Sequence, residues 1–185
     1  MGGIKILDKE GNEVHPVPVA EKSVKGINDD DDEIEEIYAG MTKSEIDAVV
    51  QDCEAQKSKG NESFSAGEYA QAILLYTLAL DHAGGSNKQL FPRHVVLSNR
   101  SASFLKLGHH DKALKDATEA VILEPTYVKA VFRKGLALHA MGQYQDAITS
   151  LGAALKIEPK NKQIKQALQF AEVRMEQEMR KRMDH

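Results

Sequence analysis

The sequence has little cysteine, few aromatic residues and no long apolar run. Among its 185 residues it has one cysteine, Cys53, no tryptophan and 5% aromatic residues. A single cysteine cannot form an internal disulfide, and this is typical of a reducing compartment. No apolar run approaches the roughly eighteen residues of a membrane span, and "MGGIKILDKE" lacks the features of a secretory signal. We therefore expect a cytoplasmic protein without a membrane span, in which Cys53 packs as a small apolar side chain.

Charges of the two signs are unevenly distributed along the chain. The formal net charge is −4, but residues 1–52 carry 5 Lys/Arg against 14 Asp/Glu, and residues 53–185 carry 19 against 14. The acidic run "DDDDEIEE" at 29–36 predicts that residues 1–41 are mostly disordered. The remainder is mildly basic without a basic cluster or a row of aromatic residues, so we expect no nucleic acid partner. A small anionic partner is favoured instead.

A helix is predicted to begin at Thr42. "TKSE" has the form of a capping box, in which Thr42 is the N-cap residue and Glu45 reaches back to it. Apolar residues then follow at near-helical spacing up to Cys53.

Three segments of the chain align with one another. The second and third are separated by 34 residues and the first and second by 41, so seven extra residues lie in "GGSNKQLFPRH". Glycine permits a tight turn, and alanine lets two helices approach closely. The aligned positions are Gly67, Gly108 and Gly142; Ala72, Ala113 and Ala147; and Ala79, Ala120 and Ala154, with Pro125 and Pro159 closing the second and third segments.

This pattern resembles the tetratricopeptide repeat, or TPR. The resemblance implies an all-α fold of three TPR helix–turn–helix repeats, at 53–86, 94–127 and 128–161, within residues 42–161. A C-terminal capping helix at 162–185 completes a right-handed superhelix of seven helices, in which the first helix of each repeat lines a concave groove. We interpret a stripe on the capping helix as core: Ile164, Leu168, Ala171, Met175 and Met179. The sequence departs from the pattern at His110 and at Gly84, where tyrosine and proline are expected.

Two pairs of polar residues four positions apart lie on first helices of the repeats. Lys57 and Asn61 share one helix face, as do Lys129 and Arg133, and Asn99 lies on the first helix of the middle repeat. This set resembles the carboxylate clamp of co-chaperones that bind the C-terminal EEVD tails of Hsp70 and Hsp90. The resemblance implies that Arg133 contacts the tail further upstream and that the terminal aspartate is held by the other four residues: Lys57, Asn61, Asn99 and Lys129. Cationic and amide donors suit carboxylates because charge-assisted hydrogen bonds are strong.

The sequence contains no pattern typical of an enzyme. No nucleophile and base occur at a recognisable spacing, and His109–His110 lacks further metal ligands. We therefore expect a protein-binding adaptor with no cofactor and no metal. The alternative is a TPR scaffold that binds an internal peptide of a non-chaperone partner in a multiprotein assembly. An import or cilium-assembly factor that uses the same clamp, and a shortened form of a larger co-chaperone, also stay open.

The sequence leaves several choices open. These are the preference between Hsp70 and Hsp90, the client, the oligomeric state, and whether residues 29–36 compete for the groove. The N-terminal segment and the C-terminal helix are expected to be available to further proteins.

Overall fold

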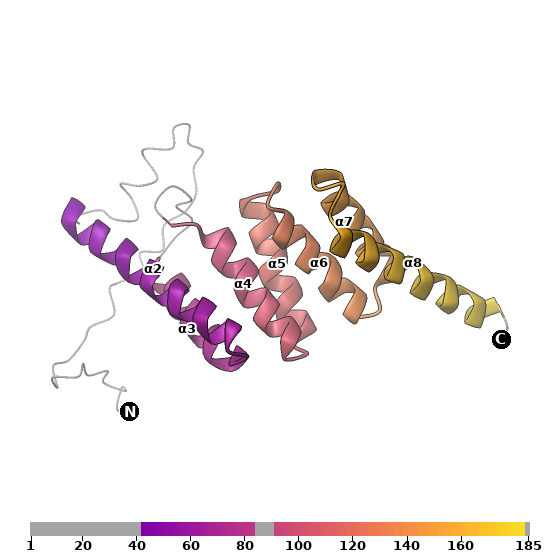
Figure 1. Ribbon diagram of the computed structural model, residues 1–185, viewed down its shortest axis with the longest axis horizontal. Coiled ribbons are helices and arrows are strands. Elements are labelled where there is room, and N and C mark those ends of the chain that lie inside the picture. Colours follow the sequence, from indigo (N-terminus) through magenta and orange to yellow (C-terminus); the bar gives the residue numbers. More distant parts are fainter. Residues whose placement is uncertain (1–41, 84–90, 184–185) are drawn as a thin grey trace, which may run out of the picture. The chain divides into compact units, whose positions relative to one another are not determined.

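The computed structural model describes residues 42–83 and 91–183, and within these ranges it contains seven helices and no strand (Figure 1). The predicted all-α helical-repeat fold is therefore confirmed. The acidic segment 1–41 lies outside the described residues. The helices are α2 (Lys43–Ser65), α3 (Tyr69–His82), α4 (Arg93–Lys106), α5 (His110–Leu123), α6 (Val128–Ala140), α7 (Tyr144–Ile157) and α8 (Lys162–Met183).

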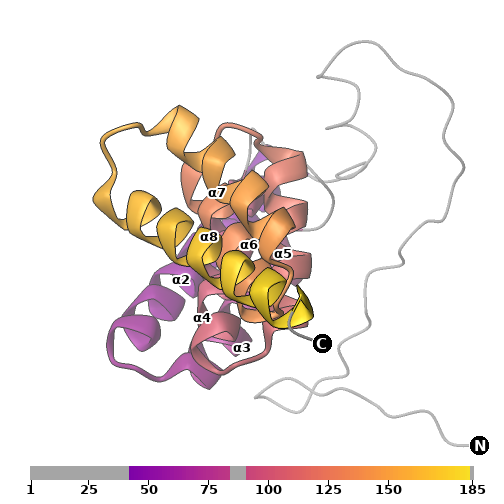
Figure 2. The same cartoon turned by 90° about the vertical axis from the view of Figure 1, so that its right-hand side faces the viewer.

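The helices pack as consecutive pairs. Within pairs, α2 contacts α3, α4 contacts α5 and α6 contacts α7, while α3–α4, α5–α6 and α7–α8 contacts join one pair to the next. The first helices α2, α4 and α6 also contact one another in order, and α6 contacts α8. The second helices α3, α5 and α7 make no such mutual contact in the described part of the chain. Figures 1 and 2 show the resulting succession of pairs, so the first helices present one continuous face.

The predicted capping box begins α2. The Thr42 N–H donates to Glu45 Oε2 at 2.7 Å, and the Glu45 N–H donates to Thr42 Oγ1 at 3.3 Å. These two bonds satisfy backbone donors that have no partner within the helix. The hydrogen bonds from Thr42 lower the pKa of the Glu45 carboxyl.

The turn within each repeat depends on a glycine with positive φ. The φ angles of Gly67, Gly108 and Gly142 are 82°, 75° and 77°, a region that side chains other than glycine rarely adopt. Each glycine follows a first helix and allows the next N–H to bond back to that helix. The three bonds are all 2.9 Å long: Glu68 N–H to Ser63 O, His109 N–H to Phe104 O, and Gln143 N–H to Leu138 O.

Small side chains bring the two helices of each repeat together. All six aligned alanines are fully buried, as is Cys53. A Cβ atom placed on Gly60 would lie 2.6 Å from Tyr76 Cε1, and one on Gly135 would lie 2.6 Å from Leu151 Cγ. The middle repeat has Ser101 at this position, and its hydroxyl donates to the Ala113 carbonyl at 2.8 Å.

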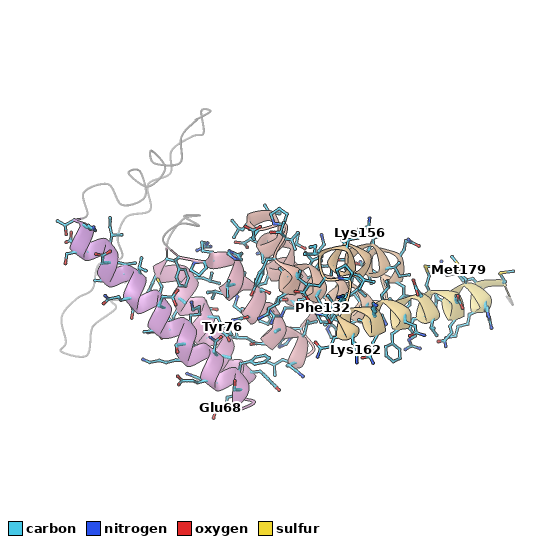
Figure 3. All side chains as sticks on the ribbon, turned by 45° about the horizontal axis from the view of Figure 1, so that its top comes forward. Glu68, Tyr76, Phe132, Lys156, Lys162 and Met179 are labelled. Carbon is cyan, nitrogen blue, oxygen red and sulfur yellow. The ribbon has the colours of Figure 1, made fainter. Side chains whose placement is uncertain are left out.

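The stripe on α8 is only partly core. Ile164 and Ala171 are buried, and Leu168 packs beside α7 residues. Met179, in contrast, is 55% exposed, so the core interpretation is wrong at this residue. The reason is geometric, because the C-terminal half of α8 extends past the helices on which its first half packs (Figures 1 and 3).

No helix within residues 42–83 and 91–183 has the length and apolar character needed to cross a lipid bilayer.

Candidate functional site

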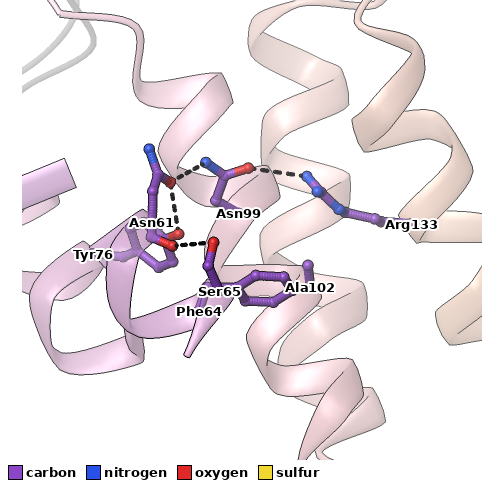
Figure 4. Close-up of a pocket in the computed structure, with 7 residues that line it drawn as sticks. All are labelled: Asn61, Phe64, Ser65, Tyr76, Asn99, Ala102 and Arg133. Carbon is purple, nitrogen blue, oxygen red and sulfur yellow. Dashed lines mark hydrogen bonds between the residues drawn. The ribbon is translucent and has the colours of Figure 1, made fainter. Parts of the chain in front are cut away.

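The five predicted site residues lie on the three first helices. Lys57 and Asn61 are on α2, Asn99 is on α4, and Lys129 and Arg133 are on α6. Three of them, Asn61, Asn99 and Arg133, line one cavity of about 170 Å³ together with Phe64, Ser65, Tyr76 and Ala102 (Figure 4). The lysines do not line this cavity. The structure therefore brings the two asparagines and the arginine into a single site and places the lysines outside it.

The polar side chains of the cavity form one hydrogen-bonded network across three repeats. The Asn99 Nδ2–H donates to Asn61 Oδ1 at 3.0 Å, and the Tyr76 hydroxyl donates to the same oxygen at 2.8 Å. Arg133 Nη1–H donates to Asn99 Oδ1 at 3.3 Å and also to the Ser98 hydroxyl oxygen. A chain of bonds thus runs from α6 through α4 to α2 (Figure 4).

This network occupies both lone pairs of Asn61 Oδ1 and one of Asn99 Oδ1, and it leaves several N–H donors available. Both lone pairs of Asn61 Oδ1 are occupied, so its amide group can offer only N–H donors to a ligand. Figure 4 shows the Asn61 nitrogen on the side of the amide away from Asn99. Asn99 keeps a second N–H, and the Arg133 guanidinium has five in total. A cavity that presents donors and a positive charge suits a carboxylate.

Arg133 carries its charge without a carboxylate partner in the described part of the chain. Its two bonded partners, Ser98 and Asn99, are neutral, and no ion pair joins it to another described residue. Burial lowers the pKa of the guanidinium, while nearby Tyr127 and Tyr76 act in the opposite direction. Arginine remains protonated in proteins despite such shifts. A half-buried cation with neutral partners is a favourable position for a bound anion.

The two lysines have different surroundings. Lys57 forms an ion pair with Glu54, one helical turn earlier, and its Nζ lies 5.9 Å from the centre of the Phe91 ring. Lys129 is exposed on α6. A carboxylate that binds Lys57 must therefore share or displace the Glu54 partner, a feature that the helix-face pattern did not reveal.

Tyr76 and Ser98 are site residues that the sequence interpretation missed. Tyr76 comes from the second helix α3 and reaches Asn61 through the space beside Gly60. Burial raises the pKa of its hydroxyl to about 12, so the group remains a donor at neutral pH. The pairing of a glycine in the first helix with a large aromatic residue sixteen positions later was the available signal.

The described residues bring together no group of three or more His, Cys, Asp or Glu side chains that could hold a metal ion. The predicted absence of a metal site and of a cofactor stays a prediction.

Comparisons with known proteins agree with the repeat pattern. A family model described as "Tetratricopeptide repeat" matches residues 128–161. The Protein STIP1 homolog of Dictyostelium discoideum is 37% identical over 116 residues, which are 63% of this chain and 19% of that protein. For eight curated relatives that it matches, the chain spans between 4% and 31% of the relative's length.

Two solved structures resemble the helical repeats. The Sgt2 TPR domain from Aspergillus fumigatus is 33% identical, with a TM-score of 0.62, and the match covers 69% of this chain and 82% of that one. The first TPR of Spaghetti (RPAP3), bound to the HSP90 peptide SRMEEVD, is 29% identical, with a TM-score of 0.61. That match covers 68% of this chain and 94% of the other.

Proposed function

Because this chain belongs to the tetratricopeptide repeat family, we propose that it is a protein–protein interaction adaptor of the co-chaperone type. It binds the C-terminal EEVD tail of Hsp90 or Hsp70 and performs no catalysis. The tail enters the face formed by α2, α4 and α6. The binding residues are Lys57, Asn61, Asn99, Lys129 and Arg133, which act as a two-carboxylate clamp.

The observation that carries this proposal is the network of the cavity, which is rich in free N–H donors. Asn61, Asn99 and Arg133 are joined by hydrogen bonds to the two amide oxygens, and they present N–H groups and one unpaired charge to the same space. A terminal residue with an acidic side chain brings two carboxylates within a few ångströms of each other. Such a group uses the available donors more fully than a neutral peptide bond does.

The size of the cavity supports a chain end as the ligand. Its volume of about 170 Å³ is below the ~300–1,000 Å³ of sites that enclose drug-sized molecules. A peptide terminus can insert one residue there while the rest of the tail lies along the first helices. In this proposal Lys57 and Lys129, one helical turn before Asn61 and Arg133, contact the second carboxylate outside the cavity.

The comparisons support the same ligand class. The Spaghetti TPR is described as bound to an HSP90 peptide that ends in EEVD, and its fold covers most of the described helices. The choice between Hsp90 and Hsp70 depends on tail residues upstream of the terminus.

One observation favours a second candidate, a scaffold that binds an internal peptide. Lys57 already has Glu54 as a partner, so a ligand that needs only Asn61, Asn99 and Arg133 avoids breaking this ion pair. Such a ligand does not require a free C-terminal carboxylate.

Calorimetry with a peptide ending in EEVD, as free acid and as C-terminal amide, separates the two candidates. We expect the free acid to bind and the amide to bind far more weakly. Lys129→Ala removes one charge-assisted contact and should weaken binding of the free acid by ~1.5–3 kcal/mol, which is about ten-fold or more. Lys129 is exposed, so the substitution should leave the thermal midpoint unchanged.

Lys156→Ala is the matched control, because Lys156 is an exposed lysine near the end of α7, outside the face formed by the first helices. It should leave the affinity unchanged. Equal binding of acid and amide would contradict the clamp and favour the internal-peptide scaffold. An equal loss of affinity in both lysine variants would show that the effect is general electrostatic attraction.

A further inference from the structure

Two further surfaces lie between consecutive repeats, and neither includes any of the five clamp residues. We call the space between α3 and α5, over α4, the first junction, and the space between α5 and α7, over α6, the second junction. Since the backbones of α3, α5 and α7 do not come close to one another, each junction must be filled by side chains or left open. The repeat spacing of 41 and 34 residues gives every position in one junction an equivalent in the other.

The first junction is filled by a buried ion pair. Arg100 of α4 donates from Nε to Asp116 Oδ2 at 2.7 Å and from Nη2 to Asp116 Oδ1 at 2.9 Å. It also donates from Nη1 to the Thr77 hydroxyl at 3.0 Å. Asp116 is only 4% exposed. One arginine therefore joins all three helices of this junction.

Further side chains add to the filling of the first junction. Phe104 of α4 has Lys112 Nζ 5.8 Å from its ring centre, a cation–π contact. Glu119 of α5 lies 3.8 Å from Arg93 in an ion pair.

The second junction has smaller residues at the same positions. Ser150 replaces Asp116, Leu138 replaces Phe104, and Ala153 replaces Glu119. These three residues line a groove of about 500 Å³. The groove is thus the space that the larger side chains occupy in the first junction.

A cation remains in this groove without its carboxylate. Lys134, the equivalent of Arg100, lines the groove together with Thr118, the equivalent of Thr77. Within the described ranges, no ion pair joins Lys134 to an acidic residue, although Asp146 also lines the groove. The hydroxyl of Ser150 is directed elsewhere, since it donates to the Val131 carbonyl at 3.1 Å.

We propose that the second junction is a docking site for a segment of a partner protein that carries an acidic side chain beside an aliphatic one. The carboxylate occupies the place that Asp116 holds in the first junction and pairs with Lys134 and Thr118. The aliphatic side chain lies against Leu138 and Val121, which line the same groove. The first junction supports an acidic ligand, because there the equivalent cation, Arg100, is paired with a carboxylate of the same chain, Asp116.

The site is independent of the proposed tail-binding face. Its residues come from α5, α6 and α7, whereas the tail face uses α2, α4 and α6. On α6 the two sites use adjacent residues, Arg133 and Lys134, which point to different faces of the helix because consecutive residues are about 100° apart. An adaptor with both sites can hold two partners at once.

The test is an NMR titration of the full chain with a capped leucine–glutamate–leucine tripeptide. Acetyl and amide caps remove the terminal charges, so the probe lacks the free carboxylate that the tail face requires. We expect millimolar binding that shifts the backbone amide signals of Thr118, Lys134 and Ser150. The matched leucine–glutamine–leucine probe should bind roughly ten-fold more weakly, because it lacks the charge-assisted bond.

Two variants test whether the probe binds in the groove. Lys134→Met keeps most of the side-chain length but removes the charge, and it should abolish the preference for glutamate over glutamine. Ser150→Asp supplies the missing carboxylate from the chain itself. It should raise the thermal midpoint and prevent probe binding. The control Lys156→Ala, at an exposed lysine that does not line the groove, should change neither the thermal midpoint nor probe binding.

Several outcomes overturn the proposal. Equal shifts with both probes, or an unchanged glutamate preference in Lys134→Met, would remove the role of the lysine. Shifts confined to Asn61 and Asn99 would assign the probe to the tail face. The absence of any shift at ten millimolar probe would exclude the site for this ligand class. If Ser150→Asp does not fold, the Lys134→Met titration alone decides.

Discussion

The first and second junctions are built from helices in the same order, yet one is closed by a buried ion pair and the other is an open groove. The backbone that forms them is the same, with glycine turns of nearly equal φ and fully buried alanines in each repeat. What differs is a set of side chains between second helices, in particular Asp116 against Ser150. The comparison teaches that the repeat pattern specifies how the two helices of a pair pack, whereas the side chains that fill a junction can differ from one repeat to the next.

The largest difference between the junctions should appear when their central polar residues are removed. Asp116→Ala leaves Arg100 buried among the three helices without its carboxylate, so the free energy of unfolding should fall by about 3–5 kcal/mol. Ser150→Ala removes a single neutral hydrogen bond to Val131 and should cost about 1 kcal/mol. Urea denaturation of both variants measures the contrast. Equal losses would mean that the ion pair does not distinguish the junctions.

Overpacking the contact between the two helices of a repeat should destabilise the first and third repeats by similar amounts. Such a result would show that the repeats differ at the junctions and not within the helix pairs. Gly60→Ala and Gly135→Ala each place a Cβ 2.6 Å from a side chain of the partner helix. Both should lower the free energy of unfolding by about 1–3 kcal/mol through overpacking. Gly152→Ala is the control, because nothing lies within 4 Å of its added Cβ. It should stabilise α7 by about 0.5–1 kcal/mol, and destabilisation there would contradict the packing explanation.

The smallest expected contrast concerns the two threonines at the edges of the junctions. The Thr77 hydroxyl accepts from Arg100 and donates to the Ile73 carbonyl at 2.8 Å. Thr77→Val should therefore cost about 1 kcal/mol. Thr118→Val removes a hydroxyl that has no hydrogen bond within residues 42–83 and 91–183, and thermal melts should show almost no change. A larger cost at Thr118 than at Thr77 would indicate that the second junction is already closed.

Much of the fold could be predicted because it follows from the spacing of particular residues along the chain. The capping box at Thr42, the turns at the three glycines and the buried alanines follow from local rules and a repeat of fixed length. Met179 could not be placed in this way. Its position in the apolar stripe is regular, but its burial depends on how far α7 extends beside α8.

The candidate site was predictable only at the level of helix faces. The i, i+4 spacing placed Lys57 with Asn61 and Lys129 with Arg133, and their roles as ligands stay predictions. The interpretation included neither the bond between Asn61 and Asn99 nor the ion pair of Lys57 with Glu54. The Asn61–Asn99 bond depends on the distance between α2 and α4, which sequence spacing does not give. Glu54, in contrast, lies three residues before Lys57 on the same helix, so that ion pair was within reach of the sequence.

The contact between Tyr76 and Asn61 has a consequence for protein engineering. The ring of Tyr76 fills the space beside Gly60, and its hydroxyl fixes the amide of Asn61. Asn61 is therefore not an independently adjustable position, since a residue without an acceptor would leave a tyrosine hydroxyl unpaired next to the core. A designer seeking altered ligand preference has more freedom at Lys129, whose exposed side chain can be exchanged without disturbing how the first two helices fit together.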